Sequence, residues 1–222
     1  MIVDLNLKGK HAVVIGGGTE GVRKVKGLLG QGCEITVITS RANRFLTTEA
    51  HNGNIELVKT TLHGADVLDN YPDAFVVLAA TNDRKLNRQL VEKGRSMSAF
   101  VYAADDPQVS DFSYASIINI EGIMQVAIST SGRSPIMARN VRIRAERVLR
   151  RIIKKTDIEN ARLQEFARHA ARPKIRTVEK RKRFLYSLIR DGRIQNLIKE
   201  DRIEDAKSAT LELLQKWERK SN

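Results

Sequence analysis

A strand, a glycine turn and the start of a helix follow one another within residues 11–29. The apolar run before the turn ends at Ile15, and Gly16, Gly18 and Gly21 follow with G-x-G-x-x-G spacing. The first glycine of this fingerprint permits a tight turn, the second lets backbone N–H groups approach a pyrophosphate, and the third lets the helix pack closely on the strand. We therefore expect a dinucleotide at the N-terminus of this helix, where unpaired N–H groups favour negative charge. The alternative is a glycine turn that only joins strand to helix.

The first half of the chain alternates strand-like and helical segments, which predicts an α/β fold with a parallel, Rossmann-type sheet and crossover helices. The strand-like runs cover residues 11–15, 34–39, 55–58, 74–80 and 99–102, and helical patterns cover residues 21–29, 41–52 and 84–93. Two further strand-like runs, at 115–119 and 124–129, predict a hairpin or a strand pair after this core.

The second half of the chain is helical from Pro135 onward. Its first apolar residues predict one face of a long helix; they are Ile136, Val141, Ile143, Val148, Leu149, Ile152 and Ile153. Pro173 interrupts the pattern, and amphipathic helices are expected at 178–190 and 203–217. Because these C-terminal segments have narrow apolar faces, we expect a second copy of the chain to cover them. The predicted division is a nucleotide-binding domain at 1–112, a dimerisation region at 113–150 and a small helical C-terminal domain at 151–222.

The charge of the chain is unevenly distributed. The formal net charge is +13, and residues 139–183 contain seventeen Lys or Arg against five Asp or Glu. Such a basic half favours an acidic partner, either nucleic acid or an anionic small substrate, unless it is only a solvated helix surface. No apolar run approaches the ~20 residues that a membrane span requires, and the N-terminus lacks the pattern of a signal peptide. The single cysteine, Cys33, suits a reducing compartment, so we expect a cytoplasmic protein.

The ends of two predicted strands carry residues that suit a dinucleotide. The second strand ends at Thr39 and Ser40 without the carboxylate that NAD-selective sheets usually place there, and Arg41 follows. Arg41 would either contact a 2′-phosphate or face solvent, so these residues alone do not decide whether the cofactor is NAD or NADP. Thr81 and Asn82 end the fourth strand, where they would contact ribose or nicotinamide. Alternatively, Asn82 or its neighbour caps the next helix.

The fifth predicted strand is followed by Asp105 and Asp106. A carboxylate at this rim of the crevice suits proton transfer or the binding of a cation, and the alternative is an ordinary acidic turn. Further along, residues 129–135 form a loop rich in hydroxyl groups and glycine, which can take an anion through its N–H groups. Ser134 precedes Pro135 and is expected to cap the helix that starts there.

Taken in order, these segments resemble the precorrin-2 dehydrogenase/sirohydrochlorin ferrochelatase family, the dehydrogenase-chelatase module of siroheme synthases. The resemblance runs from about Leu5 to Arg190. It rests on four segments, which are 16–18 with Arg23 and Lys24, 78–83, 104–107 with 111–112, and 126–139. The last segment is the most specific, because it is long and belongs to no general dinucleotide-binding pattern. The resemblance implies a NAD-binding Rossmann domain, a dimerisation region with exchanged strands and a helical C-terminal domain.

The resemblance also implies an activity, the NAD-dependent oxidation of precorrin-2 to sirohydrochlorin by a cytoplasmic homodimer, joined in some members by insertion of Fe²⁺ or Co²⁺. It places the family's catalytic carboxylate on Asp105, which outweighs the acidic-turn alternative. We expect the cofactor at Gly16, Gly17, Gly18, Thr19, Glu20, Thr39, Ser40, Thr81 and Asn82. We expect the polycarboxylate substrate at Thr130, Ser131, Arg133, Ser134 and Arg139. No resident metal is expected, and a nucleotide-responsive nucleic-acid-binding protein is the alternative function.

Overall fold

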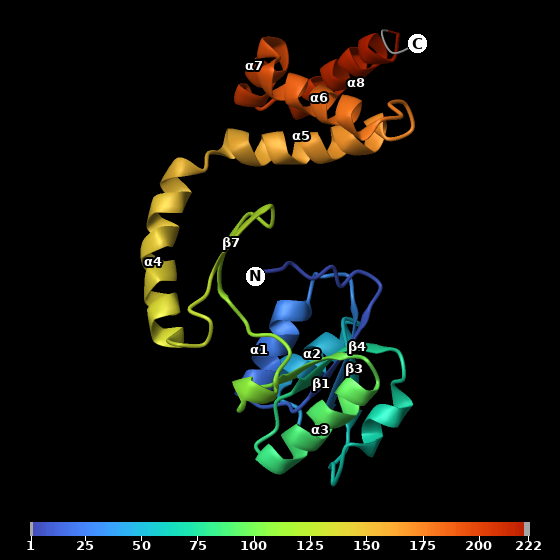
Figure 1. Cartoon of the computed structure of the whole chain (residues 1–222), viewed down its shortest axis with the longest axis vertical. Helices are drawn as coiled ribbons and strands as arrows, with labels where there is room; N and C mark the ends of the chain where they lie inside the picture. Colours follow the sequence, from blue (N-terminus) through green and yellow to red (C-terminus); the bar gives the residue numbers. More distant parts are fainter. Residues whose placement is uncertain (1, 220–222) are drawn as a thin grey trace. The chain divides into compact units, whose positions relative to one another are not determined.

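The computed structural model describes residues 2–219 and divides the chain into two compact units (Figure 1). The first unit comprises the chain up to Tyr114 together with Ser131–Arg133, and the second comprises Ala115–Thr130 and the chain from Ser134 onward. The domain boundary predicted at residue 112 stays a prediction. The predicted division at residue 150 falls inside the second unit and stays a prediction.

The first unit contains a five-stranded parallel sheet with the strand order β3-β2-β1-β4-β5. The strands are β1 (His11–Ile15), β2 (Glu34–Thr39), β3 (Glu56–Lys59), β4 (Ala74–Ala79) and β5 (Phe100–Ala103). The other elements are α1 (Thr19–Leu28), α2 (Arg44–His51), α3 (Arg84–Ser96) and the short 3₁₀ helices η1 (Asp66–Asn70) and η2 (Pro107–Val109). The strand order reverses between β1 and β4, where the carboxyl ends of the strands open a crevice. The predicted α/β fold with a Rossmann-type sheet is confirmed.

Both faces of this sheet are buried, which explains why its strands read as continuous apolar runs. Successive side chains of β1 enter different cores. Val13 packs in one core with Leu90 of α3, whereas Val14 packs in the other with Val25 of α1. The two helices therefore cover opposite faces of the sheet and hold the carboxyl ends of its strands in fixed positions.

The second unit begins with an antiparallel strand pair, β6 (Ser116–Ile120) and β7 (Met124–Ile128), which confirms the predicted hairpin. The helices that follow are α4 (Pro135–Ile152), α5 (Lys155–Ala171), α6 (Val178–Arg190), α7 (Gly192–Lys199) and α8 (Ile203–Arg219). The hydroxyl of Ser134 caps α4 as expected, because it accepts a hydrogen bond from the N–H of Met137 at 3.2 Å. Among residues 2–219, no helix has the length and apolar character needed to cross a membrane.

The C-terminal helices, whose narrow apolar faces were expected to be covered by a second copy of the chain, pack against one another in a core of their own. Helix α7 is not predicted by the sequence pattern, yet its Ile194, Leu197 and Ile198 are buried. They complete a core shared by α5, α6 and α8, in which the rings of Phe184 and Trp217 meet edge to face at 6.0 Å. Eight residues are too few to show a clear helical period, so the segment that closes this core was missed.

The expectation of a single apolar face on α4 is also wrong. Leu149 and the adjoining Ile153 pack against Ile118 of β6. Val148 and Ile152, which share a face of the helix because they are four residues apart, are 54% and 63% exposed. Helix α4 therefore has one packed side and further apolar side chains that this chain does not cover.

Lys24 of α1 is an unusual member of the first unit. Its side chain is buried, and in the described part of the chain its Nζ atom has no hydrogen-bond partner. The Nζ atom lies 4.0 Å from the ring centre of Tyr102 and 3.4 Å from that of Tyr114, so the cation contacts two aromatic rings. Loss of hydration, together with the neighbouring Arg23, lowers the pKa of Lys24 from 10.5 to about 8.

This lowered pKa makes stability depend on pH. Between about pH 8 and pH 10.5 the unfolded chain holds a proton on Lys24 that the folded chain has released, so the free energy of unfolding rises with pH in that range. A Lys24→Met variant lacks this titration. We expect the wild type to gain about 2 kcal/mol relative to Lys24→Met between roughly pH 7 and pH 9.5. Urea unfolding of both proteins at both pH values measures this gain. If the difference in the free energy of unfolding between wild type and Lys24→Met did not change with pH, the lowered pKa of Lys24 would be contradicted.

Candidate functional site

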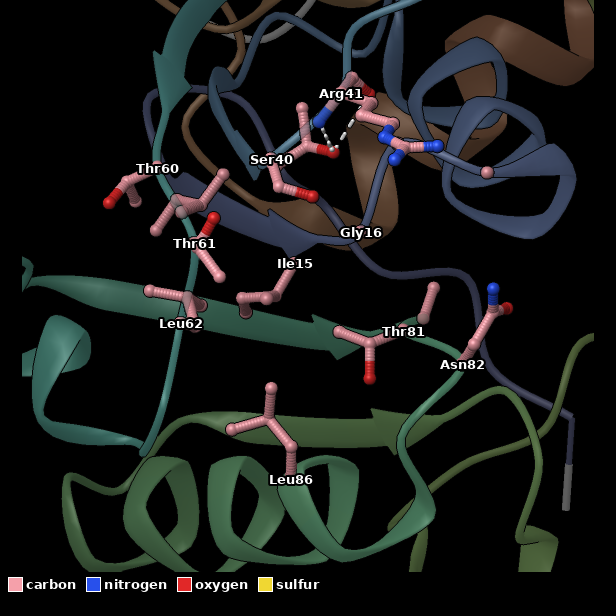
Figure 2. A pocket seen from close by; sticks show the side chains of 15 residues that line it. Ile15, Gly16, Ser40, Arg41, Thr60, Thr61, Leu62, Thr81, Asn82 and Leu86 are labelled. Atoms are coloured by element: carbon pink, nitrogen blue, oxygen red, sulfur yellow. Dashed lines mark hydrogen bonds between the residues drawn. The ribbon is translucent and has the colours of Figure 1, made fainter.

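A cleft of about 350 Å³ opens at the carboxyl ends of β1, β2 and β4 (Figure 2). Its walls are the glycine loop after β1, the residues that end β2, the segment after β3 and the residues that end β4. In Figure 2, Ser40 and Arg41 lie above Ile15, whereas Thr81 and Asn82 lie to its right. The cleft therefore occupies the point at which the strand order reverses, where such sheets bind dinucleotides.

The glycine loop combines close packing with one open position. A Cβ atom on Gly16 would overlap the carbonyl oxygen of Ala80, and a Cβ atom on Gly21 would overlap that of Gly16. In contrast, a Cβ atom on Gly18 would have no protein atom within 4 Å. Gly18 is also the N-cap of α1 and supplies no side-chain cap. The first N–H groups of α1 are thus suited to a ligand phosphate, and this loop fits the pyrophosphate of a dinucleotide.

Thr39 shapes the side of the cleft beside β2. Its hydroxyl donates a hydrogen bond to the carbonyl oxygen of Arg41 at 3.0 Å and accepts one from the Arg41 N–H at 3.3 Å. A Cβ atom on Gly17 would lie 2.6 Å from this hydroxyl, so the turn at Arg41 lies directly against the glycine loop. Thr60 and Thr61, which follow β3, add two more hydroxyl groups to the lining.

A buried amide connects the other side of the cleft to Asp105. Asn87 of α3 is 1% exposed, and its Nδ2 atom donates to the Thr81 carbonyl at 3.1 Å and to Asp105 Oδ1 at 2.7 Å. Its Oδ1 atom accepts from the N–H of Thr81 at 3.1 Å and from its hydroxyl at 2.7 Å. All the hydrogen-bonding capacity of this amide is therefore used to hold Thr81 and Asp105 in one arrangement.

The adjacent carboxylates Asp105 and Asp106 have different surroundings. The side chain of Asp106 is 7% exposed and pairs with Arg84 at 3.3 Å and with Arg88 at 3.1 Å. Its hydrogen bond with Arg88, followed by those with the Gln108 N–H and Arg84, lowers its pKa. The side chain of Asp105 is 32% exposed, with the Nε atom of Arg84 at 3.8 Å. Asp106 is thus engaged in holding the loop, whereas Asp105 presents an accessible oxygen.

The cleft brings together seven of the nine expected cofactor residues, which are Gly16, Gly17, Gly18, Thr39, Ser40, Thr81 and Asn82. Thr19 and Glu20 are not among its lining residues, and Glu20 pairs with Arg23 at 2.6 Å. Asp83, and not Asn82, caps helix α3: its carboxylate accepts hydrogen bonds from the N–H groups of Lys85 and Leu86. Direct contacts between these residues and a cofactor stay predictions.

Sequence reasoning missed Thr60, Thr61 and Asn87. The two threonines follow the third strand of a parallel sheet, so their position at the same edge was a usable signal. Asn87 gave no such signal, because it lies within a helix and only the fold brings it to Asp105. Within residues 2–219, no group of three His, Cys, Asp or Glu side chains is arranged to hold a metal ion.

The expected substrate residues lie in and after the loop between β7 and α4. The Thr130 hydroxyl accepts a hydrogen bond from the Ser134 N–H at 3.0 Å. Ser131 and Gly132 both have positive φ angles, 52° and 78°, which make the loop reverse sharply. Ser131 and Arg133 belong to the first unit, whereas Thr130, Ser134 and Arg139 belong to the second. Their role in binding substrate stays a prediction.

Comparison with known proteins identifies the family. A family model described as NAD(P)-binding matches residues 3–116, more than half of the chain. The chain belongs to this NAD(P)-binding family. The match covers the whole of the parallel sheet, and it agrees with a dinucleotide in the cleft described above.

The relatives of this NAD(P)-binding protein confirm the resemblance drawn from its motifs. A siroheme synthase of Mannheimia succiniciproducens is 32% identical over 91% of this chain, and one of Nitrosococcus oceani is 32% identical over 94%. The chain spans only 40% and 43% of these two relatives. A solved structure named SirC, precorrin-2 dehydrogenase, is 22% identical and has the same fold, with a TM-score of 0.65 over 99% of both chains. Nothing in these comparisons supports the nucleic-acid-binding alternative.

The open position at Gly18 gives a direct test of the cleft. In Gly18→Val, the added side chain would occupy the space where backbone and pyrophosphate must meet, while no protein atom within 4 Å opposes its Cβ atom. We expect a folded protein that no longer binds the dinucleotide, measured by titration calorimetry with NAD⁺ and by thermal unfolding. Gly27→Val is the matched control, because Gly27 lies in the same helix, has no close neighbours and does not line the cleft. Unchanged affinity in Gly18→Val would contradict this assignment.

Proposed function

We propose that this protein oxidises precorrin-2 to sirohydrochlorin with NAD⁺ as the hydride acceptor. The siroheme synthases that match most of the chain support this proposal, as does the shared fold with a protein named precorrin-2 dehydrogenase. Because the chain spans only about 40% of those synthases, the proposal concerns the dehydrogenase step. Insertion of Fe²⁺ or Co²⁺ into sirohydrochlorin is a separate activity, which we include in the test below.

The observation that carries the proposal is the position of Asp105. It follows β5 at the same edge of the sheet as the glycine loop, and Asn87 joins it to Thr81 in the wall of the cleft. A carboxylate placed beside the nicotinamide end of a dinucleotide is suited to remove a proton from a bound substrate.

The reaction removes two hydrogens from precorrin-2, one as hydride and one as proton. NAD⁺, when bound, supplies the acceptor for the hydride. Asp105 accepts the proton at the carboxylate oxygen that Asn87 does not engage. Asn87 keeps the carboxylate in position, and the pairs of Asp106 with Arg84 and Arg88 hold the loop that carries it. This division of roles between the two aspartates follows from their different burial.

We propose that the loop between β7 and α4 binds the acetate and propionate groups of the substrate. Thr130, Ser131 and Ser134 offer hydroxyl groups, and Arg133 and Arg139 offer positive charge. Precorrin-2 is a polycarboxylate, so cations in this loop and at the start of α4 would attract and orient it. This gives Arg133 and Arg139 a role that needs no nucleic acid.

A pair of single variants tests the catalytic assignment. We expect Asp105→Ala to form sirohydrochlorin roughly 10²- to 10⁴-fold more slowly, the usual range for a positioned acid–base group, with NAD⁺ affinity almost unchanged. We expect Asp106→Ala to unfold at a lower temperature, because Arg84 and Arg88 lose their buried partner. Absorption spectra follow precorrin-2 oxidation and, in a second assay, metal insertion into supplied sirohydrochlorin. A normal rate in Asp105→Ala would exclude Asp105 as the base, and loss only in Asp106→Ala would move the role to its neighbour.

We also propose that the protein is a cytoplasmic homodimer. The uncovered apolar side chains of α4 and its hairpin support this, since Ile136, Val148 and Ile152 on the helix and Ile117 on β6 are 73%, 54%, 63% and 47% exposed. A second copy would cover these side chains with its own equivalent surface. Cys33 is a free thiol, which suits the reducing cytoplasm.

Charges placed on this surface test the dimer. We expect the double variant Val148→Asp/Ile152→Asp to sediment as a folded monomer under conditions in which the wild type sediments as a dimer, because two carboxylates would be buried at the contact. Val178→Asp is the control, since Val178 is 72% exposed on α6, away from this surface in the sequence. A monomeric wild type, or an unchanged dimer in the double variant, would contradict the proposal.

A further inference from the structure

A cation lies beside the oxygen of Asp105 that is proposed to take the proton. Asn87 donates to Asp105 Oδ1 at 2.7 Å, so the reacting oxygen is Oδ2. The Nε atom of Arg84 lies 3.8 Å from Oδ2. This separation is short enough for an ion pair but too long for a hydrogen bond, so the arginine does not occupy the lone pairs of that oxygen. Arg84 therefore lies where a substrate must approach the base.

A buried partner holds Arg84 in this position. Its Nη2 atom donates to Asp106 Oδ2 at 3.3 Å, and the side chain of Asp106 is 7% exposed. The other oxygen of Asp106 accepts from the Gln108 N–H at 3.2 Å, which fixes the carboxylate itself. The side chain of Arg84 is nevertheless 66% exposed, and its ion pairs within residues 2–219 involve Nη2 and Nε, not Nη1. It is thus an oriented guanidinium with N–H groups available to a ligand.

The charges around Asp105 show why a cation is needed there. Asp105 and Asp106 are adjacent carboxylates, and together they would repel a polycarboxylate substrate. Arg84 and Arg88 bring two positive charges against these two negative ones. In the described residues Arg88 pairs with Asp106, at 3.1 Å, whereas Arg84 pairs with both aspartates. Of the two arginines, Arg84 is therefore the one placed to meet a substrate bound over Asp105.

We propose that Arg84 binds an acetate or propionate carboxylate of the substrate and so orients the tetrapyrrole ring over Asp105. The inference rests on the proposed dehydrogenase function and adds a substrate-binding residue to it. Acetate and propionate groups surround the ring of precorrin-2, so the carbon that loses its proton to Asp105 has a carboxylate nearby. A planar guanidinium matches a carboxylate and can engage it through the N–H groups that Asp106 leaves unused.

Arg84→Gln and Arg88→Gln form a matched pair of variants. Each removes one arginine partner of Asp106, but only Arg84→Gln also removes the cation beside Asp105, so both should lower the unfolding temperature by similar amounts. We expect Arg84→Gln to raise the KM for precorrin-2 and the Kd for sirohydrochlorin about tenfold, with kcat and the Kd for NAD⁺ within about threefold of wild type. We expect Arg88→Gln to keep the Kd for sirohydrochlorin within about twofold.

Two further measurements separate a charge contact from a structural effect. Arg84→Lys keeps the positive charge and should recover part of the lost affinity for sirohydrochlorin, followed by absorption titration. The difference in Kd between wild type and Arg84→Gln should shrink as salt is added, because the contact is electrostatic.

Each outcome decides the question. Equal losses of sirohydrochlorin affinity in Arg84→Gln and Arg88→Gln, an unchanged Kd in Arg84→Gln, or a lower kcat with unchanged KM would overturn the inference, and a wild type that still oxidises precorrin-2 would leave the proposed function intact. A wild type that neither oxidises precorrin-2 nor binds sirohydrochlorin would overturn both. Arg84-dependent binding of sirohydrochlorin by a protein that does not oxidise precorrin-2 would support the contact and remove the proposed reaction.

Discussion

The close approach of Gly16 to Ala80 is the constraint on which the first unit depends. There is no room for a side chain at Gly16, because its Cβ would overlap the Ala80 carbonyl. The end of β1 is fixed on both sides, since the Gly16 N–H donates to Ile38 at 2.8 Å and the Ala80 N–H donates to Ile15 at 2.7 Å. Because these hydrogen bonds hold the ends of β1, β2 and β4 together, the residues that follow β2 and β4 form the two walls of one cleft.

The two walls have different chemistry. Beside β2, the lining includes the hydroxyl groups of Thr39 and Ser40 and the side chain of Arg41. Beside β4, Asn87 forms hydrogen bonds with both Thr81 in the wall and the carboxylate of Asp105. A dinucleotide laid across the glycine loop would place its adenosine half against the first wall and its reactive half against the second. The proposed base, Asp105, is therefore connected to the second wall and not to the first.

Burial separates the roles of two neighbouring aspartates. Asp106 lies against Arg84 and Arg88 and uses its charge to hold the loop, and its lowered pKa follows from those contacts. Asp105 has one firm hydrogen bond, from Asn87, and a more exposed side chain. The second unit adds a helical core of its own and an uncovered apolar surface on α4, on which the proposed dimer depends.

The sequence by itself determined the order of strands and helices in the first unit, the glycine loop and most of the cleft lining, because apolar runs and glycine spacing are local signals. It also placed Asp105 at the edge of the sheet, because this residue follows a predicted strand, and the resemblance added the expectation that it is catalytic. Only the tertiary structure decided that Asn87 holds Asp105, that Asp106 is buried among arginines, that Thr60 and Thr61 reach the cleft, and that α7 completes a separate core. These contacts join residues from different elements, and a periodicity within one segment carries no information about which other segment it will meet.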